Sequence, residues 1–368
     1  MGNDMFYKTE YCLKYKDEVV FKFNMYNKTL KIVNENLLPL SLHNKSISYD
    51  LIKKFCADRI LMLNREYCKE ILTACGIDDQ NDVTICVMCK GLSFRDNYWI
   101  SRTKSTETWK NVNLYQNEFS LIISKVALTG NMSEATIDNM IGDKIFTGEL
   151  TNKGTRAKCY IRNNGNLLLF KNETRSEILS EIITYNIAAA LNIPCSQYIM
   201  KTLFEKECSV CQIFTSEQYE LIPCRDIMSM YNSGMTYDSD YYKAFMSADP
   251  ANFIKMQILD YVTLNTDRNR DNFGLLRNNG NIVSLYPLFD HDSCFKGKSA
   301  NGLYFPTGLT FAKTIELLKT QYSNFYNALE FDILNLKSIS KTEEFKANFL
   351  KYKSLDEYNS MIKRIERL

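Results

Sequence analysis

Three oxygen-bearing side chains between residues 260 and 295 are spaced in a way that suits phosphoryl transfer. Asp267 is followed five residues later by Asn272, and Asp290 comes eighteen residues after that. Transfer of a phosphoryl group to a hydroxyl requires a carboxylate that orients the hydroxyl and takes its proton. It also requires oxygen ligands for the magnesium ions that neutralise the phosphates. The spacing therefore predicts Asp267 as the base, and Asn272 and Asp290 as metal ligands.

The segments around these residues predict the elements that position them. Apolar residues recur at near-helical spacing from 253 to 262, so a helix is expected to deliver Asp267 to a loop. Residues 273–276 and 282–285 are predicted to be short strands, joined by a turn at Asn278-Asn279-Gly280. The second strand would then return Asp290 toward Asp267. Runs of Asp and Asn are often only solvated turns, but the hairpin between the oxygen donors favours a site.

The same residues resemble the catalytic and metal-binding motifs of HipA-like serine/threonine kinases. Those kinases usually carry Asn-x-Asp-x-His-x-x-Asn-Phe, followed by a hydrophobic run that ends in Tyr/Phe-Asp. This chain has NTDRNRDNFG at 265–274 and PLFD at 287–290. It departs from the pattern at Asn269, where the family usually has a histidine that contacts nucleotide or substrate. The resemblance spans roughly residues 145–330 and is most specific in its C-terminal half.

A polar loop, TNKGTRAK, runs from Thr151 to Lys158 ahead of a strand-like segment. A glycine lets backbone N–H groups approach phosphate oxygens, although one glycine and three basic residues fit a surface hairpin equally well. By position the loop resembles the phosphate-binding loop of HipA-like kinases. That resemblance implies nucleotide contacts from Lys153, Gly154, Thr155 and Lys158. In the kinase that gives the family its name this loop opens on a serine that the kinase itself phosphorylates. Thr151 takes that position and retains a hydroxyl for auto-phosphorylation.

Lys171 ends an apolar strand predicted over residues 166–171. A buried lysine needs a partner, and kinases pair such a lysine with ATP phosphates and with a helix glutamate. The alternative is an exposed lysine at the end of an edge strand. A helix predicted over residues 177–191, with Ser176 as its cap, carries Glu177 and Glu181 on one face. Either glutamate could pair with Lys171, although Glu177 also suits the first helical turn.

The resemblance also implies an overall fold and a hinge. The hinge that would hold the adenine edge is assigned to Gln212–Phe214, and Asn269 and Asn272 join the nucleotide contacts. The implied fold class is α+β, a bilobal protein-kinase-like fold with a small β-rich lobe, a large mainly helical lobe and an additional N-terminal α/β module. The expected divisions are an accessory module over residues 1–144, a small lobe over 145–225 and a large lobe over 226–368.

Composition narrows the class of protein. The chain has 368 residues, of which 45% are hydrophobic and 24% charged, as in ordinary globular proteins. A formal net charge of +2 gives no indication of direct nucleic-acid binding. No apolar run approaches the ~18 residues of a membrane span, and the charged N-terminus does not read as a secretory signal. We therefore expect a cytoplasmic protein without membrane association.

Two C-x-x-C pairs, Cys86/Cys89 and Cys208/Cys211, raise the question of a zinc site. Both pairs lie in apolar runs predicted to be strands, where residues three apart point to opposite faces. We therefore expect buried, reduced thiols of a cytosolic protein. The aromatic-rich stretch at residues 98–119 is expected to pack as core, with a partner-binding surface as the alternative.

The sequence thus predicts an ATP- and Mg²⁺-dependent kinase of the HipA-like type that phosphorylates Ser or Thr of an unidentified protein. The resemblance further implies a toxin of a toxin–antitoxin pair, restrained by a small DNA-binding partner. One alternative is a lipid or small-molecule kinase on a related fold, because the metal motif does not distinguish between acceptor hydroxyls. Another is a non-catalytic pseudokinase that scaffolds partners through its N-terminal module.

Overall fold

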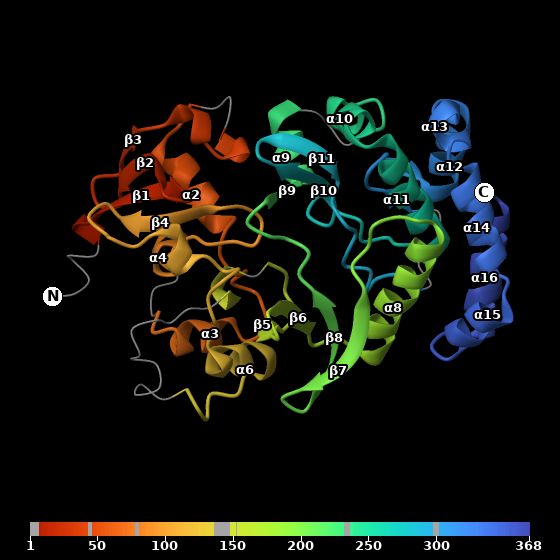
Figure 1. Cartoon of the computed structure of the whole chain (residues 1–368), viewed down its shortest axis with the longest axis horizontal. Helices are drawn as coiled ribbons and strands as arrows, with labels where there is room; N and C mark the ends of the chain where they lie inside the picture. Colours follow the sequence, from red (N-terminus) through yellow and green to blue (C-terminus); the bar gives the residue numbers. More distant parts are fainter. Residues whose placement is uncertain are drawn as a thin grey trace. The chain divides into compact units, whose positions relative to one another are not determined.

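The computed structural model describes residues 7–42, 46–77, 81–135, 148–151, 153–231, 236–296 and 302–368. The chain forms two compact units (Figure 1). Unit 1 comprises Met1–Asn172 and Thr202–Glu220, and unit 2 comprises Glu173–Lys201 and Leu221–Leu368. The division predicted between residues 144 and 145 lies outside the described residues.

Unit 1 is built on two antiparallel sheets. The first has the strand order β3-β2-β1-β4; its strands are β1 (Glu10–Tyr15), β2 (Glu18–Asn24), β3 (Thr29–Ile32) and β4 (Tyr98–Arg102). The second has the order β5-β6-β8-β7; its strands are β5 (Lys158–Asn163), β6 (Asn166–Lys171), β7 (Tyr198–Leu203) and β8 (Lys206–Gln212). Strand β6 covers the residues predicted for it.

Helices and one shared core join these two sheets. The helices of unit 1 are α2 (Tyr49–Ala57), α3 (Cys68–Ala74), α4 (Asp82–Met88), α5 (Trp109–Val112) and α6 (Leu121–Thr129). Ser48 caps α2, and its side chain accepts a hydrogen bond from Leu51 N. A single buried cluster includes Leu13 of the first sheet, Ile71 of α3 and Phe170 of β6. The N-terminal segment and the strands around Lys171 therefore bury their apolar faces together.

The strand predicted around Cys86 is wrong, because these residues form helix α4. Asn81 caps the helix, its side chain accepting from Val83 N and Thr84 N, and the helix is buried along Val83–Val87. Burial on several sides overrides the β-propensity of this run. All twelve cysteines are free, and all but Cys195 are buried. A hydrogen bond with the Cys56 thiol, together with burial, raises the pKa of Cys86 well above its usual range.

The aromatic-rich stretch packs as core, as expected. Trp99 and Trp109 are 0% and 6% exposed and belong to one buried cluster with Phe94 and Tyr160. Trp99 also donates from Nε1 to the backbone oxygen of Lys16 at 2.5 Å. These rings therefore stabilise the core of unit 1. Because the two tryptophans are buried, they cannot serve as anchors of an aromatic recognition surface.

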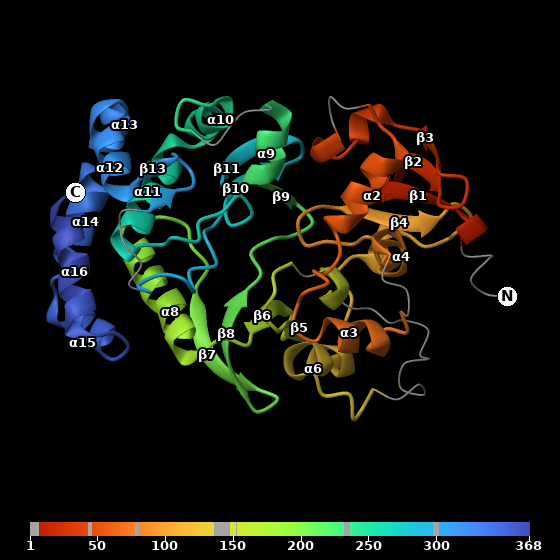
Figure 2. The same ribbon diagram turned by 180° about the vertical axis from the view of Figure 1, so that it is seen from behind.

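Unit 2 combines two small sheets with a group of helices. The sheet of order β11-β10-β9 consists of β9 (Tyr219–Pro223), β10 (Gly274–Asn278) and β11 (Asn281–Leu285), and β12 (Leu303–Tyr304) pairs with β13 (Leu309–Thr310). The helices are α8 (Arg175–Ala190), α9 (Cys224–Tyr231), α10 (Asp240–Ala248), α11 (Pro250–Thr263), α12 (Phe311–Thr320), α13 (Ser323–Asn327), α14 (Glu330–Ile339), α15 (Glu343–Leu350) and α16 (Leu355–Glu366). Figures 1 and 2 show α14, α15 and α16 side by side. Among the described residues, no helix combines the length and apolarity that a membrane span requires.

The two elements predicted to frame the candidate site are present. Helix α11 contains the predicted helical segment, and it begins at Asp249, whose side chain accepts from Asn252 N, with Pro250 at its first position. It ends at Leu264, which adopts a left-handed conformation with φ of 52°. Strands β10 and β11 pair antiparallel as the predicted hairpin. The element order helix, loop, hairpin therefore leads from Asp267 to Asp290 as the sequence predicts.

Helix α8 begins two residues earlier than predicted. Its cap is Thr174 rather than Ser176, and Thr174 forms a capping box in which Glu177 reaches back to the cap backbone. The box satisfies two N–H groups that the helix itself leaves unpaired. Glu177 is thereby placed in the first turn, as the alternative in the sequence analysis supposed.

Candidate active site

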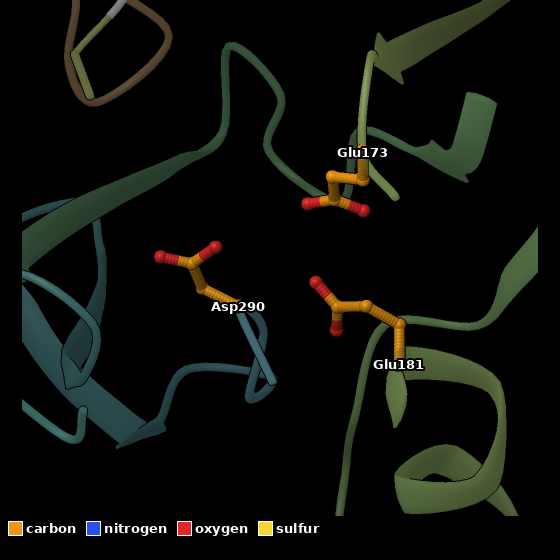
Figure 3. Close-up of side chains that lie close together, drawn as sticks. All are labelled: Glu173, Glu181 and Asp290. Carbon is orange, nitrogen blue, oxygen red and sulfur yellow. The ribbon is translucent and has the colours of Figure 1, made fainter. Parts of the chain in front are cut away.

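Three carboxylates converge in unit 2 (Figure 3). Glu173 precedes α8, Glu181 lies on α8 and Asp290 follows β11, and one oxygen atom of each lies within 4.8 Å of the others. Glu173 and Glu181 are 6% and 0% exposed. Like charges at this spacing repel one another, and a cation relieves the repulsion. Carboxylate oxygens are the ligands that Mg²⁺ prefers, so the cluster has the chemistry of a divalent-metal site.

The backbone at Asp290 is in a conformation that residues other than glycine seldom adopt. Its φ is 64°, in the left-handed region. Such conformations persist where the surrounding structure holds them, and they concentrate at functional sites. The observation therefore agrees with the predicted role of Asp290 without depending on the carboxylate cluster.

Asn272, the other predicted metal ligand, is oriented by the loop that carries Asp267. Its side-chain nitrogen donates to the backbone oxygen of Asp267 at 3.2 Å, and its backbone N donates to Asn269 O at 3.1 Å. A carboxamide whose nitrogen is used in this way offers its oxygen to a ligand. Asn272 is 6% exposed, whereas the Asp267 side chain lies at the surface. An exposed carboxylate can meet the hydroxyl of an acceptor molecule.

Asn269, at the family's histidine position, stabilises the loop itself. Its side-chain oxygen accepts from Asp271 N at 2.9 Å, and its nitrogen donates to Asp267 O at 3.3 Å. Both bonds close turns within a few residues, a use for which Asn is well suited. The nucleotide contact predicted for Asn269 stays a prediction.

The two glutamates predicted on one face of α8 have different partners. The Glu177 carboxylate accepts from Thr174 N at 2.9 Å and forms an ion pair with Lys296 at 2.9 Å. Glu181 instead accepts at Oε2 from the backbone N of His291 at 2.9 Å. Glu177 thus closes the helix start, whereas Glu181 is bonded to the segment that carries Asp290.

In unit 1, the predicted phosphate-binding loop is held by lysine side chains that bond to backbone oxygens. Lys158 Nζ donates to Lys153 O at 2.7 Å, and Lys153 Nζ donates to Ala57 O at 2.7 Å. Gly154 has a φ of 92°, which favours glycine, and a Cβ added there would lie 2.6 Å from Lys158 Nζ. These contacts give the loop a defined shape around its glycine.

The flanks of this loop are also anchored within unit 1. Thr155 O accepts from Glu66 N at 2.8 Å. Thr151 is half-buried, and its hydroxyl donates to Gly148 O at 2.9 Å. The hydroxyl predicted to be phosphorylated is therefore engaged in a hydrogen bond in this structure.

Lys171 is buried at the end of an interior strand. Strand β6 lies between β5 and β8, and Lys171 stands opposite Lys158 on one side and Ser209 on the other. Its exposed fraction is 5%, so the alternative of an exposed edge lysine is wrong. The predicted hinge begins at Gln212, which is exposed at the end of β8, and Phe214 beyond it is half-buried. The described structure therefore places these predicted nucleotide contacts in unit 1, and the base and metal ligands in unit 2.

Sequence reasoning missed Glu173. A signal was available, because Glu173 lies only two residues beyond Lys171 and directly before the Thr174–Glu177 capping box. A carboxylate directly before a buried helix lies near the side chains of the first turns of that helix. Its approach to Asp290, however, joins segments more than a hundred residues apart and follows only from the fold.

These features define an α+β fold of the protein-kinase-like class with an additional N-terminal module, as predicted, and solved structures agree. No protein-family model matches the chain. The chain is similar along its length to HipA of Shewanella oneidensis MR-1, solved as a complex of toxin–antitoxin HipA, HipB and operator DNA. The TM-score is 0.54 at 12% identity, and the match covers 97% of both chains. The predicted resemblance to HipA-like kinases is thereby confirmed at the level of the fold.

A curated relative carries a kinase name. The serine/threonine-protein kinase CtkA of Helicobacter pylori is 27% identical over 131 residues, which cover 31% of this chain and 39% of that protein. The match thus spans about two fifths of the curated relative. The crystal structure of CtkA aligns with a TM-score of 0.36 at 15% identity, over 57% of this chain and 89% of that one.

Proposed function

We propose that this chain is an ATP- and Mg²⁺-dependent kinase that transfers the γ-phosphoryl group to a Ser or Thr hydroxyl of a protein. The observation that carries the proposal is the cluster of Glu173, Glu181 and Asp290, which suits a divalent metal. It lies in the same unit as the exposed carboxylate of Asp267. The sequence spacing of Asp267, Asn272 and Asp290 and the kinase-like fold point to the same chemistry.

Each proposed residue has a role that its surroundings allow. Asp267 orients the acceptor hydroxyl and takes its proton as the hydroxyl oxygen bonds to the γ-phosphorus and the bond to the β-phosphate oxygen breaks. Asp290 and the Asn272 oxygen would hold magnesium, which neutralises phosphate charge, and Glu173 and Glu181 complete the acidic surroundings. Lys171, together with Lys153, Gly154, Thr155 and Lys158, would contact phosphates. Gln212–Phe214 would contact the adenine.

The pairing of Lys171 with Glu177 or Glu181 stays a prediction, and the two glutamates differ in their contacts within unit 2. The Glu177 carboxylate is already used by the capping box and by Lys296. Glu181 is fully buried and carries its charge toward the Asp290 segment.

The biological role is proposed from the relatives. The HipA of the solved complex is a toxin–antitoxin protein bound to HipB and operator DNA. By analogy this chain would act as the toxin of such a pair, restrained by a small DNA-binding antitoxin, with no direct nucleic-acid contact of its own. Its free, buried thiols fit the reducing cytoplasm. Thr151 would be a site of auto-phosphorylation once its hydroxyl leaves Gly148 O.

The test is transfer of phosphate from Mg²⁺-ATP by the purified chain, with phosphorylated residues mapped by mass spectrometry. Asp267→Asn removes the proton acceptor and should lower the transfer rate by about 10²–10⁴-fold. Asp290→Asn should abolish detectable transfer. Asp271→Asn is the matched control, because Asp271 is exposed in the same loop and pairs with Arg225 at 3.1 Å. It should stay within about threefold of the parent, as surface ion pairs contribute little.

The outcomes separate the alternatives. Transfer by Asp290→Asn at the parent rate would refute the proposed metal ligand. Transfer to lipid vesicles or small alcohols, but to no protein, would favour the lipid or small-molecule kinase. Binding of Mg²⁺-ATP that raises the melting temperature without any transfer would favour a pseudokinase scaffold. If the chain neither binds Mg²⁺-ATP nor transfers phosphate, the proposal is overturned.

A further inference from the structure

A buried arginine joins the two segments that carry the proposed metal ligands. Arg268 is 1% exposed, and each of its five N–H donors has an acceptor. Nε and Nη2 donate to the Asp260 carboxylate at 2.9 and 3.0 Å. Nη1 donates to the backbone oxygens of Asn272 and Phe289 at 2.8 and 3.3 Å. The other Nη2 hydrogen faces Nε2 of His291 at 3.0 Å.

The acceptors of Arg268 bracket the proposed ligands. One is the backbone of Asn272 itself, and two others, Phe289 and His291, flank Asp290 on either side. Asp290 adopts its left-handed conformation between these two held neighbours. The guanidinium therefore fixes the Asn272 backbone relative to the Asp290 backbone, although it bonds to neither proposed metal-binding oxygen.

His291 extends this contact to helix α8. A guanidinium only donates hydrogen bonds, so Nε2 of His291 is the acceptor in this contact. Nδ1 lies 3.5 Å from Glu181 Oε2, and the backbone N of His291 donates to the same oxygen at 2.9 Å. Arg268 thus also determines where Glu181 meets the Asp290 segment.

Asp260 on α11 supplies the counter-charge and is itself fully used. It is 0% exposed, and its carboxylate accepts from Asn265 Nδ2 at 3.1 Å and from the Tyr304 hydroxyl at 2.7 Å, besides Arg268. Burial alone would lower the pKa of Arg268, but the charge and hydrogen bonds of Asp260 raise it above its usual value. Arg268 therefore keeps its charge, and a lysine, which lacks the planar fork, could not make the same set of bonds.

We propose that Arg268 is a positioning residue for phosphoryl transfer, which aligns Asn272, Asp290 and Glu181 by holding the backbone around them. The inference rests on the proposed function and names what sets the geometry of that same site. Arg268 is enclosed among protein groups and acts through the proposed metal ligands. Residues that orient metal ligands in this way typically change metal affinity or activity by 10–100-fold when replaced.

The test is the variant Arg268→Lys, which keeps the charge and removes the fork. Binding of Mn²⁺ in the presence of a non-hydrolysable ATP analogue is followed by electron paramagnetic resonance, and transfer from Mg²⁺-ATP is measured in parallel. We expect Mn²⁺ affinity to fall at least about tenfold and kcat about a hundredfold, with KM for the acceptor nearly unchanged. All values are taken per folded molecule, from the circular dichroism of the same samples.

Arg364→Lys is the matched control in the same unit. Arg364 is 9% exposed, and its described acceptors, Val262 O at 2.8 Å and Ser360 Oγ at 2.9 Å, do not belong to the proposed site. This variant should lose stability but keep the parent's Mn²⁺ affinity. If both variants lose affinity equally, or if Arg268→Lys keeps it, the positioning role is refuted.

Two further outcomes keep the test decisive. If Arg268→Lys does not fold, Tyr304→Phe removes one hydrogen bond from Asp260 and leaves Arg268 intact. That variant should weaken Mn²⁺ binding severalfold, and an unchanged affinity would count against the inference. If the parent neither binds Mn²⁺ nor transfers phosphate, the proposed function fails and the inference falls with it. A parent that binds and transfers, beside an unaffected Arg268→Lys, overturns the inference alone.

Discussion

Each unit of the molecule contains a buried arginine paired with an aspartate, and the two pairs differ in what their remaining hydrogen bonds hold. In unit 1, Arg59 meets Asp96 with two hydrogen bonds of 2.7 Å. In unit 2, Arg268 meets Asp260 with bonds of 2.9 and 3.0 Å. The two arginines are 3% and 1% exposed. Burial alone would lower the pKa of each arginine, but the charge and hydrogen bonds of its aspartate outweigh burial and raise that pKa.

The difference lies in the backbone oxygens that each guanidinium also binds. Arg59 donates to Gly91 O at 2.6 Å and to Tyr98 O at 3.1 Å, so it fixes the segment between α4 and β4. That segment contains none of the proposed site residues. Arg268 donates instead to the backbone on both sides of the proposed chemistry. The same ion pair thus serves the fold in one unit and the candidate site in the other.

Ion pairs of this kind constrain geometry more than they add stability. Removing charges from water costs several kcal/mol, so such a pair is weak evidence of net stability. What it does impose is geometry, because an unsatisfied member would be strongly destabilising. Whether that geometry has a functional consequence depends on which segments receive the remaining donors.

The largest expected effect comes from breaking each pair and then replacing it whole. Arg268→Met leaves the buried Asp260 carboxylate without its counter-charge and should cost about 3–5 kcal/mol of the free energy of unfolding. Arg59→Met should cost less, because the Asp96 side chain is 19% exposed. Adding Asp96→Leu or Asp260→Leu should recover part of that loss in each case. Phosphoryl transfer should return to near the parent rate only in the Arg59→Met/Asp96→Leu chain. The measurements are urea denaturation and the transfer rate per folded molecule.

Both tryptophans, Trp99 and Trp109, lie in unit 1, so their fluorescence follows that unit alone. Hydrogen exchange of α11 and α8 follows unit 2. The comparison breaks if the Arg268→Met/Asp260→Leu chain regains the parent transfer rate. It also breaks if the double replacement in unit 1 is folded but inactive.

A smaller effect is expected from acid in unit 1. Burial alone would raise the pKa of Asp96, but the charge and hydrogen bonds of Arg59 outweigh it and lower the pKa. An aspartate in an unfolded chain has a pKa of about 3.9. The pair therefore stabilises unit 1 fully above that pH, and its contribution is lost as pH falls through the lower folded-state value.

Tryptophan fluorescence during urea denaturation at pH 7, 4 and 3 measures this effect. The free-energy difference between the parent and Asp96→Asn should shrink on acidification, by an amount on the order of 1 kcal/mol. Asp17→Asn serves as a control, because the described contact of Asp17 is a hydrogen bond that its Oδ1 accepts from the Trp109 backbone N at 2.7 Å. A parent and an Asp96→Asn chain with parallel pH dependence would show that Asp96 does not carry the effect.

Much of the local structure around the candidate site could be predicted from sequence. Helix α11, the β10–β11 hairpin and strand β6 each show a hydrophobic period within one short window, and the spacing of Asp267, Asn272 and Asp290 is also local. Even the correct start of α8 could have been predicted, since Thr174 and Glu177 have the types and spacing of a capping box. Such features depend on contacts between near neighbours in the chain.

What could not be predicted depends on distant contacts. An arginine is usually exposed, so nothing in the type of residue 268 distinguishes it from exposed Arg270. Its burial follows from Asp260 on one side and Phe289 on the other. Glu173 meets Asp290 for the same kind of reason. The strand prediction around Cys86 was wrong for a different reason, because the β-branched residues there fit a buried helix as well as a strand.

The smallest effect is expected in the predicted phosphate-binding loop of unit 1, where a variant tests whether this loop, rather than the ion pair, contributes to the chemistry. Gly154 has a φ of 92°, and an added Cβ would meet only the far end of Lys158, at 2.6 Å from Nζ. The Lys158 side chain can move aside, but the backbone strain remains. Gly154→Ala should therefore cost about 1 kcal/mol of stability. In this variant the added Cβ moves Lys158 Nζ away from its bond to Lys153 O. If the loop contacts phosphates, the affinity for Mg²⁺-ATP should therefore fall severalfold.

Gly165→Ala separates strain from nucleotide binding in this last case. Gly165 has a φ of 79° in the turn between β5 and β6, and an added Cβ would have no atom within 4 Å. It should lose about the same stability as Gly154→Ala, while thermal shift with Mg²⁺-ATP gives the parent's affinity. Equal affinities in both glycine variants would remove the loop from the proposed site. Unit 1 would then keep the buried Lys171 and the Gln212–Phe214 segment as its proposed nucleotide contacts.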